Sequence, residues 1–250
     1  MTAYTKRLQK VTAVLCTTAL LAGCAAGTSD NTEPAATTAQ VKTITIEPTA
    51  AYQTMNGFGA SACWWSQEVG NWENAKDILS LLYDENSGIG LNIYRYNLGA
   101  GSKDDATITD PDRRAEAFID KDGSYHWERD AAAQNALALA RSMNEDLRVT
   151  LFSNSAPVFY TANGKAYCDY LPDEENYVTN LEPERYADFA KYSIACAKHF
   201  TEAGYRVTGL SPINEPEWSW RGYEDGTAKQ EGCYYSKTQC RDLYKVFLKQ

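Results

Sequence analysis

The chain carries two kinds of hydrophobic pattern, which alternate along its length. Apolar side chains recur at helical spacing in four segments, at residues 71–85, 129–144, 182–204 and 236–250. Short runs of β-branched and aromatic residues predict strands at residues 54–61, 88–99, 147–157 and 205–216. Residues 42–50, KTITIEPTA, alternate between polar and apolar positions and predict one more strand before these. Four strand–helix pairs in succession predict an α/β fold with a parallel sheet.

The long loops all lie on the same side of the predicted strands. They follow the strand ends at residues 100–128, 154–182 and 214–235, whereas the opposite loops are short. Active sites of β/α barrels and ligand sites of doubly wound sheets both form at this edge, so this pattern alone fits either fold. The first strand is followed by no GxGxxG sequence, and the chain has no P-loop. A nucleotide site is therefore disfavoured.

The first residues look like an export signal. Three cations precede VTAVLCTTALLA, an apolar run that is too short to span a bilayer. The run ends in LAGC, which resembles the bacterial lipobox, so we expect residues 1–23 to be removed and Cys24 to receive lipid. Residues 24–41 then form a flexible tether, and residues 42–250 form the folded part. This predicts a secreted, cell-surface lipoprotein held at the membrane only through Cys24; an ordinary signal peptide is the alternative.

Composition and charge disfavour several classes of binding partner. The formal net charge is -9 and there is no basic stripe, so nucleic acid and anionic membrane surfaces are disfavoured. His126 and His199 lack metal-ligand spacing, and we expect no metal and no cofactor. Cys168 and Cys233 lie on long loops, where a disulfide between them could form after export, although spacing alone leaves the pairing open.

Polar and aromatic side chains gather where the predicted strands stop, and together they suit a sugar, whose hydroxyls need planar donor and acceptor groups. These residues are Ser61, Trp64, Trp65, Arg95, Tyr96, Asn97, Asn154, Ser155, Phe159, Tyr160, Asn214, Glu215, Trp218 and Trp220. Among them, Glu215 sits beside the rigid Pro216. We expect neighbouring aromatic rings to exclude water from Glu215, which would suit a general acid near neutral pH.

Several of these residues have a structural alternative. Adjacent strand residues point to opposite faces, so only one of Trp64 and Trp65 is expected to face the cleft. Arg95 could be a salt-bridge partner instead of a substrate ligand, and Asn154 could cap a turn. Trp218 could pack against the loop that contains Cys233.

Four blocks occur in the order GFGASACWW, GLNIYRYNLGAG, NSAPVFYTANGKAYC and SPINEP…QEGCYYS. Together they resemble glycoside hydrolase family 30, especially its endo-β-1,6-galactanase-like branch, over about residues 52–236. The resemblance implies a (β/α)₈ TIM barrel and retaining hydrolysis of a β-linked polysaccharide, with endo-β-1,6-galactan the favoured substrate. It implies that Glu215 is the acid/base and that Asn214 binds the sugar hydroxyl at carbon 2. By the same resemblance, Arg95 supports the pocket of the nucleophile. Trp64, Asn154, Tyr160 and Trp218 would contact substrate, and residues 42–50 would join a side β-sandwich.

The resemblance covers only part of such a barrel. The family's nucleophile lies at the end of the seventh strand, whereas only four strand–helix units are visible here. We therefore expect the chain to be the front half of an enzyme and to lack the nucleophile. Two alternatives remain open: a non-catalytic carbohydrate-binding surface lipoprotein, and an inactive truncated fragment.

Overall fold

The structure is a computed structural model that describes residues 44, 45, 47, 49–172 and 177–250. The chain divides into two units, residues 1–52 and residues 53–250, and the fold described below is that of the second unit. In the first unit, residues 44, 45, 47, 49 and 50 form no strand and are exposed. The strand expected at residues 42–50 is therefore wrong for these positions. Alternation alone does not make a strand, because a strand also needs a hydrogen-bonded partner.

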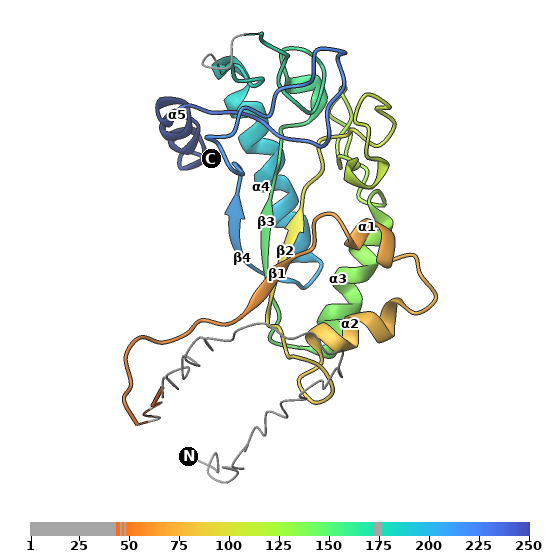
Figure 1. Cartoon of the computed structure of the whole chain (residues 1–250), viewed down its shortest axis with the longest axis vertical. Helices are drawn as coiled ribbons and strands as arrows, with labels where there is room; N and C mark the ends of the chain where they lie inside the picture. The colour runs from red at the N-terminus through yellow and green to blue at the C-terminus, as the bar shows by residue number, and fades with distance from the viewer. Residues whose placement is uncertain (1–43, 46, 48, 173–176) are drawn as a thin grey trace, which may run out of the picture. The chain divides into compact units, whose positions relative to one another are not determined.

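A four-stranded parallel sheet in the order β1-β2-β3-β4 forms the centre of the second unit (Figure 1). The strands are β1 (Gly59–Ser61), β2 (Ile93–Asn97), β3 (Arg148–Phe152) and β4 (Arg206–Ser211). Tyr94 lies opposite Val149, and Leu151 lies opposite Leu210. The parallel sheet expected from the strand–helix order is confirmed, although each strand is shorter than its hydrophobic run. The ends of those runs continue as loops.

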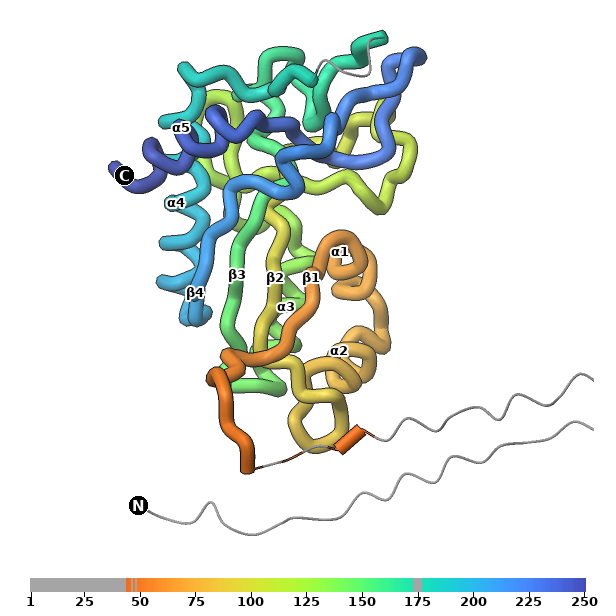
Figure 2. The backbone as a smooth tube through the Cα atoms, turned by 60° about the vertical axis from the view of Figure 1, so that its left-hand side comes forward, coloured from red at the N-terminus to blue at the C-terminus, as the bar shows by residue number. Residues whose placement is uncertain are grey.

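Helices connect the strands. They are α1 (Ser66–Val69), α2 (Ala75–Tyr83), α3 (Ala131–Met143), α4 (Tyr186–Glu202) and α5 (Lys237–Phe247). The four helices expected from the sequence are confirmed as α2 to α5, and the four-residue α1 is too short to produce a periodic signal. Ser236 and Gln239 form a capping box that fixes the start of α5. In Figures 1 and 2, α3 runs beside β2 and α4 runs beside β4, in agreement with their contacts.

A core of buried aliphatic and aromatic side chains fills the space around the sheet. It includes the fully buried Tyr94 and Tyr96 of β2, together with Tyr83, Leu79, Leu137 and Phe200 of the helices. The side chain of Tyr96 is satisfied by Asp130, to which its hydroxyl donates at 2.6 Å. In the described part of the chain, no helix is both long and apolar enough to cross a membrane.

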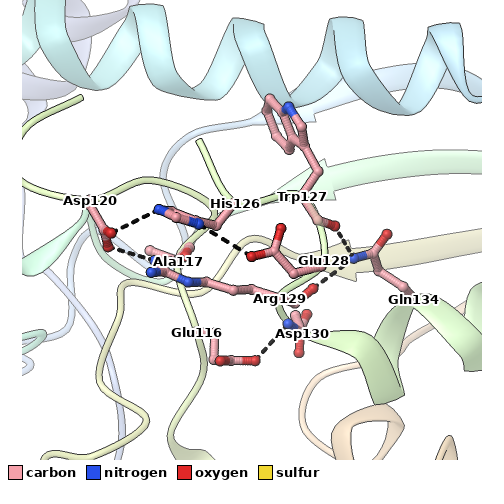
Figure 3. A network of polar contacts seen from close by, with 9 residues as sticks. All are labelled: Glu116, Ala117, Asp120, His126, Trp127, Glu128, Arg129, Asp130 and Gln134. Atoms are coloured by element: carbon pink, nitrogen blue, oxygen red, sulfur yellow. Dashed lines mark hydrogen bonds and ion pairs between the residues drawn. The ribbon is translucent and has the colours of Figure 1, made fainter. Parts of the chain in front are cut away.

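The loop between β2 and α3 is held by a polar network near its end (Figure 3). Arg129 Nη1 lies 2.7 Å from Asp120 Oδ1, and Glu116 Oε2 accepts the backbone N–H of Asp130 at 2.6 Å. Asp130 has a φ of 52°, a left-handed conformation that is uncommon outside glycine. These contacts fix the start of α3. They also hold the long loop at the carboxyl ends of the strands, where the other long loops meet (Figure 2).

Candidate active site

Arg95 and Asn214 bring the ends of β2 and β4 together. The Nη2 of Arg95 donates to Oδ1 of Asn214 at 2.9 Å, and its Nη1 donates to Ser61 Oγ at 3.4 Å. The guanidinium stacks on Phe152, with Cζ 3.3 Å from the ring centroid. Burial lowers the pKa of Arg95, and the charge of Glu215 is close enough to oppose that shift. Arg95 therefore binds another predicted site residue, and the described residues give it no ion pair.

Glu215 lies next to this pair, with its side chain exposed. Its backbone is fixed, because its carbonyl accepts from the indole Nε1 of Trp220 at 2.9 Å and from the backbone N–H of Trp218 at 3.1 Å. It has a φ of 44°, a conformation that costs free energy for a non-glycine residue and is often found at functional sites. The exclusion of water that we expected is not found among the described residues. β4 is the last strand in the order of the described sheet.

Asn154 is buried in a network of amides at the ends of the strands. Its Nδ2 donates to Asn97 Oδ1 at 3.1 Å and lies 3.5 Å from the sulfur of Cys63. The side chain thus connects β1, β2 and β3 rather than capping a turn. Asn97, expected from the sequence only as one of the surrounding polar groups, is part of the same network.

The two adjacent tryptophans lie in the turn after β1 and not on the strand, and only one of them packs on the core. Trp65 packs against the core, with its ring 6.4 Å from that of Tyr94, and its indole donates to the carbonyl of Ser61 at 2.9 Å. Trp64 is partly exposed and is not among the side chains packed on that core. Trp64 is therefore the tryptophan of this pair that is available to a ligand.

An aromatic groove is lined by residues 218–224 and 228–230 of the loop after β4, which also carries Glu215, and by Tyr170 and Tyr177 of the loop after β3. Its volume is about 720 Å³, within the range of ligand sites. Four exposed aromatic side chains line it: Tyr170, Tyr177, Trp218 and Tyr223. Trp218 is 66% exposed, so the alternative in which it packs against the Cys233 loop is not what the structure shows.

Tyr160 is placed elsewhere. Its ring packs edge-on against Phe159 at 4.7 Å, and the guanidinium of Arg185 lies 5.5 Å from its centroid. Tyr160 is absent from the residues that line the aromatic groove. The structure therefore does not bring Tyr160 together with Trp218, because Tyr160 is partly buried against the core.

Glu231 is a buried carboxyl group outside the set of site residues expected from the sequence. It is 0% exposed, and its Oε1 accepts from the backbone N–H of Ala100 at 3.1 Å and from Ser102 Oγ at 2.6 Å. Burial raises its pKa to about 8. Nothing in the sequence marks it as buried, because QEGC reads as an ordinary loop. The one signal in the sequence is the glycines near it, Gly99 and Gly101 in the loop after β2 and Gly232 in the loop after β4, which allow the two loops to approach closely.

The disulfide considered for Cys168 and Cys233 is not formed, since both are free thiols in the structure. They are neighbours, however, and the hydrogen bond to Cys233 together with burial raises the pKa of Cys168. The backbone N–H of Tyr234 also donates to the sulfur of Cys168, at 3.4 Å. The two loops that carry them are therefore in contact with or without a covalent bond.

Two further predictions concern lipid and metal. Cys24, with the signal and tether at residues 1–23 and 24–41, lies outside the described residues. Within the described ranges, no cluster of three or more histidine, cysteine, aspartate or glutamate residues could hold a metal ion. The arrangement can bind a polyhydroxylated ligand through amides, a guanidinium and aromatic rings. It can also present one carboxyl group for proton transfer.

Comparisons with known proteins agree with this chemistry. A family model described as O-Glycosyl hydrolase family 30 matches residues 41–250. An endo-β-1,6-galactanase from Hypocrea rufa is 30% identical over 219 residues, which cover 77% of this chain and 43% of that one. An exo-β-1,6-galactobiohydrolase from Bifidobacterium longum subsp. longum is 27% identical over 241 residues, covering 72% of this chain and 15% of the relative. The chain thus spans less than half the length of either relative.

A solved structure of a conserved exported protein from Bacteroides fragilis matches with a TM-score of 0.71 and 28% identity. The match covers 82% of this chain and 42% of that one. The fold class expected from the sequence is confirmed, as the first four β/α units of a partial TIM barrel. The resemblance drawn from the four sequence blocks is confirmed as well.

Proposed function

The chain belongs to O-glycosyl hydrolase family 30, and from this membership we propose that the protein takes part in retaining hydrolysis of β-1,6-linked galactan. Glu215 is the acid/base in this proposal, and Asn214 binds the sugar next to the bond that is cleaved. The relatives from Hypocrea rufa and Bifidobacterium longum are both named for β-1,6-galactan chemistry, which supports this substrate class.

The observation that carries the proposal is the bond of 2.9 Å between Arg95 and Asn214, directly before Glu215. Arg95 donates to Oδ1 of Asn214, and Nδ2 of the same amide has no hydrogen-bond partner among the described residues, so it can donate to a sugar oxygen. Glu215 is the next residue in the sequence, so its carboxyl group follows directly after this amide. A hydroxyl ligand and a proton donor are thereby presented side by side at the end of β4.

In the proposed reaction, protonated Glu215 donates its proton to the departing glycosidic oxygen as the bond to the anomeric carbon breaks. A second carboxylate, about 5–5.5 Å from the first in retaining enzymes, attacks that carbon and forms a glycosyl-enzyme intermediate. Glu215, now ionised, removes a proton from water, which hydrolyses the intermediate. We assign no described residue to the second carboxylate.

The aromatic groove supports a polymeric substrate. It lies on the loop that carries Glu215, and that residue protonates the leaving part of the chain, so we propose that the groove holds sugar units of the leaving part. Trp218 and Tyr223 would stack against the C–H faces of these sugars, because aromatic rings combine a large apolar surface with little conformational freedom to lose.

The proposed function is tested on the full-length gene product that carries residues 1–250. We expect it to release β-configured sugars from β-1,6-galactan, read directly by proton NMR before mutarotation. Glu215→Gln should lower turnover at least about a thousandfold, within the range of lost general acid catalysis and lost charge stabilisation, while substrate binding persists. Glu217→Gln, an exposed glutamate of the same loop, is the matched control. Release of the α-anomer, or full activity of Glu215→Gln, would reject the proposal.

A non-catalytic carbohydrate-binding role is the second candidate, because the exposed side chain of Glu215 and the open aromatic groove also suit binding alone. The same assay separates the two functions. A binding protein would retain β-1,6-galactan in affinity electrophoresis and release no sugar, with either glutamate or glutamine at position 215.

We further propose that the protein is a cell-surface lipoprotein modified at Cys24. The support is the LAGC sequence after a short apolar run. Mass spectrometry of the mature N-terminus is the test. A diacylglyceryl group on Cys24, lost in Cys24→Ser, is expected, and an unmodified N-terminus at another residue would contradict it.

A further inference from the structure

Glu231 joins three of the loops that surround the candidate site. Its Oε1 accepts from Ala100 and Ser102, both in the loop after β2, at 3.1 and 2.6 Å. The carbonyl of Ala100 in turn accepts from the backbone N–H of Val158, in the loop after β3, at 2.8 Å. Glu231 itself belongs to the loop after β4. One fully buried side chain thus holds the loops of three neighbouring strands in register.

From Glu231 the contacts lead on to Glu215. The adjacent Gly232 lies against the indole of Trp220, so closely that a Cβ there would come within 2.2 Å of the ring. Trp220 has a φ of 48° and donates its indole N–H to the carbonyl of Glu215. Both Trp220 and Glu215 have left-handed backbones, which persist only where their surroundings hold them. The segment at residues 231–232 is part of those surroundings.

The second carboxyl oxygen of Glu231 makes ionisation of this group costly. Its Oε2 is buried and has no hydrogen-bond partner among the described residues. The neighbouring Gln230 is bound by Arg113. An ionised carboxylate at this position would therefore leave a buried negative charge with one unpaired oxygen, which is costly. A neutral carboxyl group accepts from the same two loop donors and buries no charge, while its hydroxyl lacks an acceptor among the described residues.

We propose that Glu231 is a positioning residue for the acid/base: its neutral form ties the β2 and β4 loops together and thereby holds Trp220 and Glu215 in place. This inference rests on the proposed function of Glu215. It adds a role to a carboxyl group that does not enter the proposed reaction.

The charge state makes the coupling depend on pH. Burial raises the pKa of Glu231 to about 8, so the group is neutral below that pH and ionises above it. The titratable groups that influence it are Asp130, Cys63 and Tyr192. The pKa of Asp130 is raised to about 7, so it ionises first, while burial raises the pKa of both Cys63 and Tyr192 above their ordinary values. We therefore expect the loops to loosen as the pH passes about 8.

Two variants of the full-length protein test this. Glu231→Gln keeps an acceptor for Ala100 and Ser102 but cannot ionise, and Glu231→Ala removes the acceptor. The first readout is independent of activity: the ¹⁵N resonance of the Trp220 indole, assigned with Trp220→Phe and followed from pH 6 to 9.5. In the wild type it should titrate near pH 8. In Glu231→Gln it should stay at its low-pH position, and Glu217→Gln should behave like the wild type.

The second readout is the pH profile of kcat on β-1,6-galactan. The wild type should lose activity above about pH 8, and Glu231→Gln should keep it to higher pH. Glu231→Ala should lower kcat at least about tenfold, an effect of roughly 1.4 kcal/mol on the barrier. A Trp220 resonance that titrates in Glu231→Gln as it does in the wild type would overturn the inference. A resonance that behaves as expected in a protein that hydrolyses no β-linked glycan would reject the proposed function and leave the coupling standing.

Discussion

The indole nitrogen of Trp220 donates a hydrogen bond of 2.9 Å to the backbone carbonyl of Glu215. The two residues are five positions apart, and both have positive φ angles. The bond closes the turn after β4 and fixes the backbone from which the proposed acid/base projects. It also links that turn to Gly232 and so to the buried Glu231.

Removing this bond should impair turnover more than binding. Trp220→Phe keeps an aromatic ring over Gly232 but cannot donate, so the turn at Glu215 should loosen. A neutral hydrogen bond contributes about 0.5–1.5 kcal/mol, which corresponds to a fall in kcat of roughly two- to tenfold. Steady-state kinetics on β-1,6-galactan measures it, with the exposed Trp72→Phe as the control. An unchanged kcat would show that the bond does not position Glu215.

Replacing Arg95 by lysine should disturb Asn214. A lysine keeps the positive charge but cannot donate to both Asn214 and Ser61 while lying flat on Phe152. We expect kcat/KM to fall at least about tenfold, since the lost bond involves a charged donor and such bonds contribute roughly 1.5–3 kcal/mol. Arg206→Lys, at an exposed position of β4, is the matched control. Equal kcat/KM in both variants would contradict the role of Arg95.

Truncating the aromatic groove should separate long substrates from short ones. Trp218→Ala removes the most exposed of the tryptophans on this loop and should raise KM for β-1,6-galactan about tenfold. Hydrolysis of an aryl β-galactobioside, whose leaving group is not a sugar, should be nearly unaffected. Tyr244→Ala, an exposed aromatic on α5, serves as the control. If both substrates lose affinity equally, the groove does not bind the leaving part of the chain.

Asp130 should make stability depend on pH. Burial raises its pKa from 3.8 to about 7, so the folded protein keeps a proton that the unfolded chain releases between these values. Stability should therefore fall as the pH rises from about 4 to 7, by up to the order of 4 kcal/mol, and level off above. Urea unfolding at pH 5 and pH 8 measures this difference. Asp130→Asn should reduce it, whereas Asp104→Asn, at an exposed site, should not. A wild type that is equally stable at both pH values would refute the assignment.

The neighbouring thiols should be able to cross-link. Oxidation of the folded protein should join Cys168 and Cys233 and raise its stability by about 2–4 kcal/mol, because the bond would close a long loop in the unfolded chain. Peptide mapping without reductant identifies the pair, and thermal unfolding with and without dithiothreitol measures the gain. Cys168→Ser should abolish both effects. A different cysteine pair in the oxidised protein would contradict the contact seen here.

The sequence could predict the sheet because strands such as Ile93–Asn97 and helices such as Ala131–Met143 carry local patterns. It could also predict that Arg95 and Asn214 meet, because the carboxyl ends of parallel strands lie at one edge of the sheet. The way in which one loop packs on another could not be predicted, because no local sequence pattern encodes it. Tyr160 and Trp218 read alike in sequence, yet Tyr160 packs beneath Arg185 while Trp218 faces solvent.

The burial of Glu231 is another feature that no local pattern in the sequence predicts. This residue stands in a polar loop with no local pattern that marks it as buried. Its burial depends on Ala100 and Ser102, about 130 positions away along the chain. The exposure of the Glu215 side chain is likewise not encoded in the motif SPINEP.

Chemical rescue of Glu215→Ala tests the central claim most directly. With an aryl β-galactoside whose leaving group needs no proton, the variant should form the glycosyl-enzyme and then stall, because no base activates water. Added azide, which needs no base, should restore turnover and give a β-galactosyl azide. Formation of that product is the result expected if Glu215 is the acid/base. An azide-independent rate, or an α-configured product, would contradict it.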